Sequence, residues 1–334
     1  MKDIVRWGVV GNARIARQAL IPAIRKAKNA ELTAVASRSA AKAKEAADTY
    51  GFRKFHDSYE ALLRDPDVDA VYIPLPNGLH AEWTVKAARA GKHVLCEKPA
   101  ALTAVQAQQM VEACHANDVV FMEAFMYQFH PQHERVRAIV ASGEIGEVRL
   151  MHSRFAFRLD DPGNVRFDKK LGGGALYDVG CYCIHSSRHI LGAEPSAVYA
   201  RAHADPDSGV DLTTTGMLSF DHGLQASFDC SFETVPGEFF EVIGDKGRIH
   251  VQRPYRPDKN EDGQGRIVVT MADGESRVER IAGDSYVLQV EHFSQCVLDH
   301  SAPTYFGQAT VRNMKVIDAC RQSIRSGQAV PLGF

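Results

Sequence analysis

The sequence lacks the marks of membrane proteins and of nucleic-acid-binding proteins. Among 334 residues, 39 are lysine or arginine and 41 are aspartate or glutamate, which gives a formal net charge of −2. Without a basic excess, neither a nucleic acid nor an anionic membrane surface is an expected partner. No apolar run approaches the roughly 20 residues of a membrane span. The first apolar segment, Ile4–Val10, follows no basic leader, so we expect no secretion signal.

Cysteine is scarce and arranged in a way that argues against disulfides. The chain has seven cysteines, an odd number, and none of them forms a C-x-x-C pair. Most lie inside apolar segments. We therefore predict reduced, buried thiols in a globular, cytoplasmic protein that is long enough for two domains.

Short apolar segments alternate with helical patterns through the first third of the chain. The expected strands are Ile4–Val10, Glu31–Ser37, Ala70–Ile73, His93–Cys96 and Val119–Glu123. Helical patterns fall between them, for example Ala40–Tyr50 and a helix opened by Thr103 as N-cap. Strict alternation predicts an α/β Rossmann domain over residues 1–125, with a doubly wound parallel sheet of about six strands.

From about Phe125 onward, strands follow strands across short turns. The expected strands are Glu147–Phe157, Ala197–Ala204, Gly216–Phe220, Leu224–Phe232 and Gly247–Val251. This order predicts an α+β domain over residues 126–334, with a large, mainly antiparallel open sheet. A helix over about Gln308–Arg325 is expected to close the chain.

The first strand runs into the glycine-rich turn Gly8-Val9-Val10-Gly11, which favours a pyrophosphate at the following helix N-terminus. Ala13 stands where a strict G-x-G-x-x-G motif has its second glycine, so a plain tight turn is the alternative. The second strand ends in Ser37 and Arg38, where a carboxylate would select NAD. A guanidinium beside hydroxyls favours NADP over NAD, although Arg38 could also be an exposed residue beside a helix cap.

Two further strand ends point to the same edge of the sheet. The segment from Pro74 to His80 follows one strand, and Glu97-Lys98-Pro99 follows the next. Pro99 disfavours the α conformation at Lys98, so the lysine is expected to be extended and aimed into the cleft. The alternative is a surface lysine whose stem covers apolar atoms.

A third motif lies in the second domain. The triple glycine Gly172–Gly174 precedes Asp178 and Tyr182, which are one helical turn apart and would share a face at the edge of a cavity. An ordinary helix with a satisfied core tyrosine would look the same. His185 and His189 continue the stripe, so metal binding is a further, weaker alternative.

These motifs together resemble the Gfo/Idh/MocA oxidoreductases in order and spacing over nearly the whole chain. Within that family the chain looks most like the branch of NADP-dependent D-xylose 1-dehydrogenases, dimeric dihydrodiol dehydrogenases and glucose-fructose oxidoreductase. Supporting segments are Ala13–Ala16, Met122–Tyr127 and Tyr182. The resemblance implies these cofactor-binding residues: Gly11, Asn12, Ala13, Arg14, Ile15, Ser37, Arg38, Leu75, Asn77, His80, Glu97 and Lys98.

The resemblance also implies a mechanism. A sugar hydroxyl gives a hydride to the nicotinamide while a side chain removes the hydroxyl proton. Neither tyrosine nor lysine is a good base at neutral pH with its ordinary pKa, but a cationic Lys98 nearby would lower the pKa of Tyr182. We assign Tyr182 as acid/base, Lys98 as its partner and substrate ligand, and Asp178 as substrate orienter. In the alternative, Lys98 transfers the proton. Phe157 and Arg166 complete the expected substrate site.

The expected reaction is NADP-dependent oxidation of the C1 hydroxyl of an aldose, D-xylose or D-glucose, to the lactone. Alternatives are a keto-sugar reductase, a trans-dihydrodiol dehydrogenase or a non-catalytic NADP-binding sensor. Gln128 departs from the arginine typical of related xylose dehydrogenases and puts the sugar in doubt. The polar loop Arg158–Arg166 either contributes substrate hydrogen bonds or is simply solvated.

The family further implies a homodimer or homotetramer through the C-terminal sheet. Alternating apolar residues in the expected strand Leu224–Phe232 suit such an interface. A strand covered by helices of its own domain would show the same alternation.

Overall fold

The computed structural model describes residues 3–305 and 307–334, which divide into two compact units. The first unit contains the chain up to Met126 and the segment Ser285–Met314, and the second contains Tyr127–Asp284 and Lys315–Phe334. The sequence led us to expect a second domain that runs unbroken over residues 126–334, whereas Ser285–Met314 groups with the first unit. The reason is packing: fully buried Trp7 contacts Phe293, with ring centroids 5.1 Å apart, and donates to the Ser294 hydroxyl at 3.1 Å.

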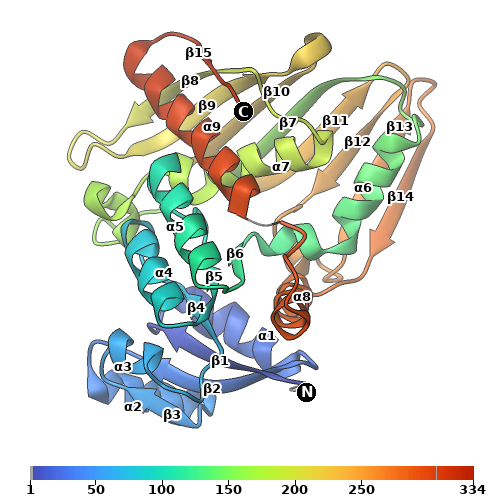
Figure 1. Ribbon diagram of the computed structural model, residues 1–334. Helices are drawn as coiled ribbons and strands as arrows, with labels where there is room; N and C mark the ends of the chain where they lie inside the picture. Colours follow the sequence, from blue (N-terminus) through green and yellow to red (C-terminus); the bar gives the residue numbers. More distant parts are fainter. Residues whose placement is uncertain (1–2, 306) are drawn as a thin grey trace. The chain divides into compact units, whose positions relative to one another are not determined.

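The first unit is built on a six-stranded parallel sheet in the order β3-β2-β1-β4-β5-β6 (Figure 1). This is the doubly wound order in which ligands bind outside the carboxyl ends of the strands. The predicted Rossmann class is confirmed, and β3 is a strand that the sequence analysis did not specify. The strands are β1 Val5–Val10, β2 Ala30–Ala36, β3 Lys54–His56, β4 Ala70–Ile73, β5 His93–Cys96 and β6 Phe121–Glu123.

Three helices of this unit begin at short polar side chains that accept backbone N–H groups. Thr103 accepts from Gln106 N at 3.2 Å, as its sequence pattern predicted. Ser39 and Ser58 cap two others in the same way. The helices are α1 Ile21–Lys26, α2 Ala40–Tyr50, α3 Tyr59–Leu63, α4 His80–Arg89, α5 Ala104–Ala116 and α8 Ser285–Asp299.

The second unit is built on a nine-stranded sheet in the order β14-β13-β12-β11-β7-β10-β9-β8-β15. Only the β7–β10 pair is parallel among the strand pairs of the described residues in this sheet, so the predicted mainly antiparallel sheet is confirmed. The strands are β7 Val148–Ala156, β8 Ala197–Ala204, β9 Asp211–Ser219, β10 Gln225–Ser231, β11 Gly237–Gly244, β12 Gly247–Gln252, β13 Gly265–Met271, β14 Ser276–Ile281 and β15 Val330–Pro331.

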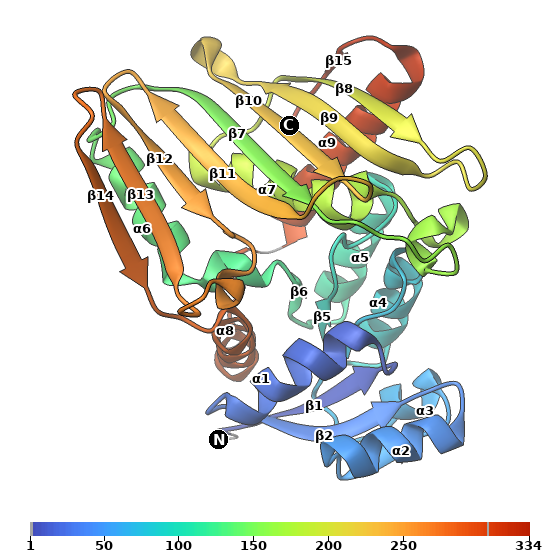
Figure 2. The same ribbon diagram turned by 180° about the vertical axis from the view of Figure 1, so that it is seen from behind.

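Helices α6 (Pro131–Ala141) and α7 (Cys181–Leu191) lie on one face of this sheet, and the strands come to the front in the opposite view (Figure 2). The helix α9 (Gly307–Ser326) extends from the first unit into the second. On β10, Phe228 and Cys230 are buried, and Cys230 Sγ lies 2.9 Å from the position of a methyl group on Gly180, the residue before α7. The apolar alternation of this strand therefore faces helices of its own domain and does not form a subunit interface.

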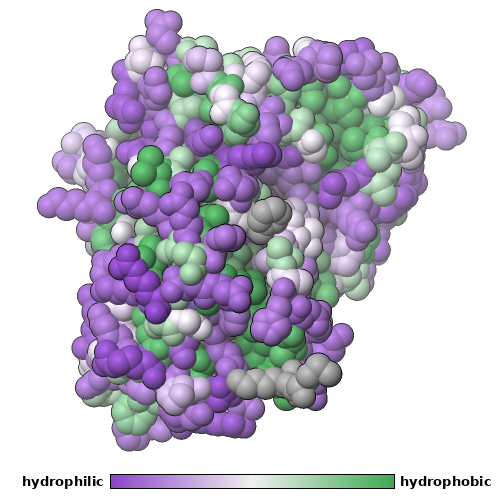
Figure 3. All heavy atoms as spheres, viewed as in Figure 1, coloured by the Kyte–Doolittle hydropathy of each residue, from purple (hydrophilic) through white to green (hydrophobic). Residues whose placement is uncertain are grey.

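The opposite face of the sheet carries exposed apolar side chains. Leu150, Tyr199 and Met217 are 48%, 39% and 46% exposed. Tyr199 and Met217 are direct partners across β8 and β9, so their side chains point to the same face. Hydrophilic residues cover most of the molecular face seen in Figure 3. No helix in the described part of the chain combines the length and apolarity needed to cross a membrane.

Candidate active site

The glycine-rich turn after β1 leaves room for a ligand. Gly11 has a φ of +100°, a conformation that favours glycine, and its N–H donates to Ala36 O at 2.9 Å. A cavity of about 440 Å³ opens here in the first unit. Its lining residues are Gly11, Asn12, Ala13, Arg17, Ser37, Arg38, Lys42, Glu45, Tyr59, Pro74, Leu75 and Pro76.

Positive charge gathers on the side of this cavity formed by the end of β2. Arg38 was expected there, and the structure adds Arg17 and Lys42, against one carboxylate from Glu45. Burial raises the pKa of Tyr59, and the neighbouring Arg38 guanidinium opposes that shift. Three cations around one cavity provide what a phosphate monoester needs. Arg17 could have been found from the sequence, because it lies one helical turn after Ala13.

The turn fits a dinucleotide by two further observations. A side chain on Gly11 would approach Leu75 Cδ2 to 3.1 Å and would take up space at the wall of the cavity that both residues line. The side-chain oxygen of Asn12 is buried without a hydrogen-bond partner. Such an orphaned acceptor in a cavity wall is suited to a hydroxyl or amide group of a bound ligand.

Six of the predicted cofactor residues do not line this cavity: Arg14, Ile15, Asn77, His80, Glu97 and Lys98. Arg14 donates along its own helix to Gln18 Oε1 at 3.1 Å. The carboxylate of Glu97 accepts from the Tyr72 hydroxyl at 2.5 Å, so the sheet itself occupies one of its oxygens. These positions were implied by the family resemblance, and their contact with the cofactor stays a prediction.

His80 is a buried connector between two turns. Its Nδ1 lies 2.8 Å from Pro99 O and its Nε2 lies 2.7 Å from Leu75 O. Burial lowers the pKa of His80 to about 4, so the ring is neutral at pH 7. Both nitrogens face backbone carbonyl oxygens, and a neutral ring, which has a single N–H, donates to one of them. His80 links the turn after β4 to the turn after β5.

Lys98 follows β5 at the same sheet edge as the Gly11 turn. Strand β4 pairs in parallel with both β1 and β5, so the turns after these three strands lie at one end of the sheet. Lys98 is half-buried and its backbone N–H donates to Glu97 Oε2 at 3.3 Å.

In the second unit the triple glycine brings a loop onto the helix that carries Asp178. Gly174 N donates to the carbonyl oxygen of Arg166 at 3.0 Å. A methyl group on Gly173 would overlap that same carbonyl. The Arg166 side chain then reaches Asp178, with Nε 2.6 Å from Oδ2. Glycine is needed here because the backbone of another segment approaches so closely.

Asp178 and Tyr182 lie across a change of helix type. The segment Leu176–Gly180 is a π-helical turn and α7 begins at Cys181, so the residues are not on one regular α-helix as predicted. They still share a neighbour. Asp178 raises the pKa of the Arg166 guanidinium, and Tyr182 acts in the same direction. Arg166 also lies over the Phe157 ring at 5.9 Å. The four predicted substrate residues of this unit therefore lie together.

Aromatic rings surround Tyr182. The rings of Tyr127, Phe155 and Tyr255 have centroids 5.9, 5.4 and 5.1 Å from that of Tyr182. Behind them, the Tyr127 hydroxyl and His185 Nδ1 are 2.5 Å apart. The sequence analysis did not select Tyr255, whose position is set by tertiary packing.

The histidines of the metal alternative are buried and neutral. Burial lowers the pKa of His189 to about 3 and places that of His185 well below its ordinary value. Across the described residues, no group of three or more potential metal ligands comes together.

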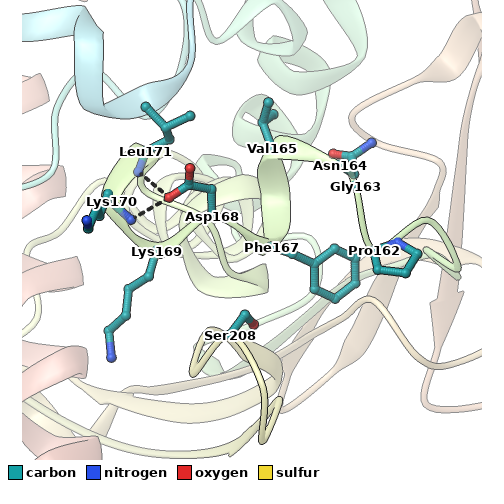
Figure 4. Close-up of a pocket in the computed structure, with 10 residues that line it drawn as sticks. All are labelled: Pro162, Gly163, Asn164, Val165, Phe167, Asp168, Lys169, Lys170, Leu171 and Ser208. Atoms are coloured by element: carbon teal, nitrogen blue, oxygen red, sulfur yellow. Dashed lines mark hydrogen bonds between the residues drawn. The ribbon is translucent and has the colours of Figure 1, made fainter.

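The polar loop before the triple glycine forms a second cavity, of about 570 Å³, which Figure 4 shows from close by. Asp168 folds back to accept the N–H groups of Lys170 and Leu171 at 2.8 and 3.2 Å. Arg158 and Asp160 at the start of the loop are exposed and pair with each other at 2.8 Å. The loop thus combines a solvated beginning with an end, Arg166, that belongs to the site.

Comparison with known families agrees with both units. Residues 5–125 match the profile of an oxidoreductase family with an NAD-binding Rossmann fold, and residues 133–250 match the GFO/IDH/MocA C-terminal domain.

Similar proteins cover nearly the whole chain. A D-xylose 1-dehydrogenase (NADP(+)) of Haloferax volcanii is 39% identical, over 98% of this chain and 99% of its own length. The crystal structure of a 3-ketoreductase from Actinomadura kijaniata, in complex with NADP and TDP-benzene, has a TM-score of 0.91 at 33% identity and covers 96% of this chain and 98% of its own. An aldose-aldose oxidoreductase from Caulobacter crescentus, complexed with glycerol, has a TM-score of 0.90 at 27% identity, with coverages of 98% and 100%.

The approach of Arg166 to Gly173 predicts a costly substitution. Gly173→Ala should lower the free energy of unfolding by about 1–3 kcal/mol, because the methyl group overlaps backbone that cannot rotate away. Urea titration measures the change. Gly333→Ala is the control, since a methyl group there meets nothing within 4 Å and should change stability by less than about 0.5 kcal/mol. Equal stability of the two variants would contradict the close approach.

Proposed function

The chain belongs to the Gfo/Idh/MocA family of oxidoreductases, and on this basis we propose that it oxidises the C1 hydroxyl of an aldose to the lactone with NADP. D-xylose and D-glucose are the leading substrates. The observation that carries the proposal is the Asp178 carboxylate bonded to Arg166 beside Tyr182. An acceptor, a donor and an acid/base group in one cluster suit a polyhydroxylated substrate. The similarity to the D-xylose 1-dehydrogenase supports an aldose.

NADP is the proposed cofactor, and when bound it accepts the hydride. Arg38, Arg17 and Lys42 would hold the 2′-phosphate, which NAD lacks. The amides of the Gly11 turn would face the pyrophosphate. NADP appears in the names of the dehydrogenase and the 3-ketoreductase described above, which supports this choice.

The side chains then divide the work of oxidation. Tyr182 takes the proton of the C1 hydroxyl as the C1 hydride leaves with its two electrons. Asp178 and Arg166 orient the sugar through neighbouring hydroxyls. Lys98, at the sheet edge that holds the cofactor turn, stabilises the tyrosinate and binds the reacting oxygen. In the alternative distribution Lys98 accepts the proton itself.

A keto-sugar reductase is the second candidate. The 3-ketoreductase structure, with a TM-score of 0.91, favours it. The same residues serve the reverse reaction, because Tyr182 then donates the proton that the alkoxide takes up after hydride transfer.

We also infer a homodimer or homotetramer that forms through the open face of the C-terminal sheet. The exposed Leu150, Tyr199 and Met217 support this face as the contact.

The first test is turnover of NADP or NAD by the purified protein, followed by NADPH absorbance, with a panel of aldoses, polyols and dihydrodiols. The reverse direction is assayed with keto-sugars. We expect reduction of NADP by D-xylose or D-glucose. Activity only with keto-sugars or dihydrodiols would move the assignment to the corresponding alternative, and binding of NADP without any turnover would favour a sensor.

Arg38→Ala tests the cofactor choice. We expect a loss of about 10- to 100-fold in affinity for NADP and little change for NAD, because only NADP carries the phosphate. Titration calorimetry measures both. Arg53→Ala is the matched control, since Arg53 lies outside the cavity and pairs with Glu31 at 3.0 Å. An equal loss for both cofactors would mean that Arg38 does not contact the 2′-phosphate.

Tyr182→Phe tests the acid/base role. Turnover should fall by at least about 100-fold while NADP affinity is retained, because only the hydroxyl is removed. Tyr50→Phe, at the end of α2 and outside both cavities, is the control. Turnover of Tyr182→Phe close to that of the wild type would leave Lys98 as the proton-transferring group.

A further inference from the structure

A carboxyl group that no part of the site has yet used lies on the helix-covered side of the large sheet. Glu238 begins the alternation on β11 that continues with Phe240 and Val242, both fully buried. Its direct partner on β7 is Phe155, so both side chains project from the same face. An acidic residue at a position of this kind is unusual, because the positions that follow it are apolar core.

Through Phe155, Glu238 borders the group of rings around Tyr182. Phe155 lies 5.4 Å from Tyr182 and stacks on Tyr255 at 5.2 Å, centroid to centroid. Tyr255 itself is within 5.1 Å of Tyr182. Glu238 is therefore the strand neighbour of Phe155, a ring that contacts the proposed acid/base residue Tyr182.

One oxygen of the Glu238 carboxyl group is not satisfied by the protein. Its Oε2 is buried and has no hydrogen-bond partner. Burial raises the pKa of Glu238 to about 7, although the positive charges of Arg256 and Arg253 act in the opposite direction. Arg256 is already paired with Asp258 by two bonds of 2.8 Å. A backbone hydrogen bond from Arg256 also acts to lower the pKa of Glu238, so one side of the carboxyl group has a partner and the buried Oε2 has none.

The chain around it is also held in a special conformation. Arg253 has a φ of +48°, which non-glycine residues rarely adopt, and its N–H donates to the backbone carbonyl of Glu238 at 2.9 Å. This turn leads directly into Tyr255. Local strain next to a buried carboxyl oxygen without a partner is a combination that occurs at ligand sites.

We propose that Glu238 binds a hydroxyl group of the sugar away from the reacting carbon and makes the site selective for polyhydroxylated substrates. This inference rests on the proposed function. A sugar hydroxyl both donates and accepts, so it can pair with the carboxyl in either protonation state. A deoxy position or a hydrocarbon ring against the same group would leave the acid unpaired and would be rejected. The expected substrates are therefore fully hydroxylated sugars rather than dideoxy sugars or dihydrodiols.

A cycle of enzyme and substrate changes tests this pairing. Wild type, Glu238→Leu and Glu238→Gln are assayed for kcat/KM with D-glucose, D-xylose and a series of monodeoxy glucoses. Removal of the contacted hydroxyl should cost the wild type about 10- to 100-fold. Glu238→Leu should lose a similar factor in kcat/KM with the parent sugar, mainly through KM. Removal of the contacted hydroxyl should then lower the kcat/KM of this variant no further. Glu238→Gln keeps the shape and should retain part of the discrimination.

Glu241→Gln is the matched control, because Glu241 lies on the same strand but on the opposite face and pairs with Arg248 at 3.5 Å. It should keep the wild-type profile. If Glu238→Leu fails to fold, as judged by circular dichroism, the isosteric Glu238→Gln carries the test. If the loss caused by Glu238→Leu and the loss caused by the missing hydroxyl add up for every deoxy sugar, Glu238 contacts none of these hydroxyls and its proposed role is overturned. The proposed sugar dehydrogenase activity would stand. Wild-type protein that binds NADP but neither binds nor turns over any of these sugars would overturn the proposed function, and this inference with it.

Discussion

The site of the second unit depends on the glycine turn Gly172–Gly174, where two backbone N–H groups donate to two acceptors from other segments. Gly174 has a φ of +114° and donates its N–H to the carbonyl of Arg166 at 3.0 Å. Two residues later, Leu176 N–H donates to the Asp211 carboxylate at 2.6 Å. A methyl group on Gly174 would overlap Asp211. Together these contacts determine where the π-helical turn begins, and that turn carries Asp178 toward Arg166. The ion pair is thus a consequence of backbone geometry, not its cause.

Local patterns were sufficient to predict the elements whose signals are local. Strand His93–Cys96, helix Ala40–Tyr50 and strand Ala197–Ala204 lie where the sequence placed them. Thr103 begins its helix for the reason expected, because a hydroxyl can accept a free N–H of the first turn. Alternation of strand and helix was likewise enough for the doubly wound sheet. Asp178 and Tyr182 were selected because an unusual glycine run precedes them, and the structure places Arg166 beside Asp178, while their roles stay predictions.

The sequence analysis could not predict contacts between residues that are distant in the chain. The segment Ser285–Met314 returns to the first unit because Phe293 packs on Trp7, a contact between residues nearly 300 positions apart that no local pattern encodes. An acidic residue in a strand, such as Glu238, resembles a solvent-facing position until its partner is known to be Phe155. His80 shows the converse case. Its ring was expected to contact the cofactor from the sequence pattern, but no local pattern shows that its two nitrogens face the backbone carbonyls of Leu75 and Pro99.

The two units use charge in different ways, and the difference follows from what each is proposed to bind. A phosphate is permanently charged, so a cavity lined by fixed cations such as Arg38 can attract it without moving a proton. A sugar is neutral, and attraction alone cannot distinguish one hydroxyl pattern from another. The Asp178 carboxylate is fixed by Arg166 and can only orient what it meets. Glu238 has an oxygen without a partner. A substrate without a hydroxyl at that position leaves this oxygen unpaired and binds less tightly, and we propose that the site selects in this way.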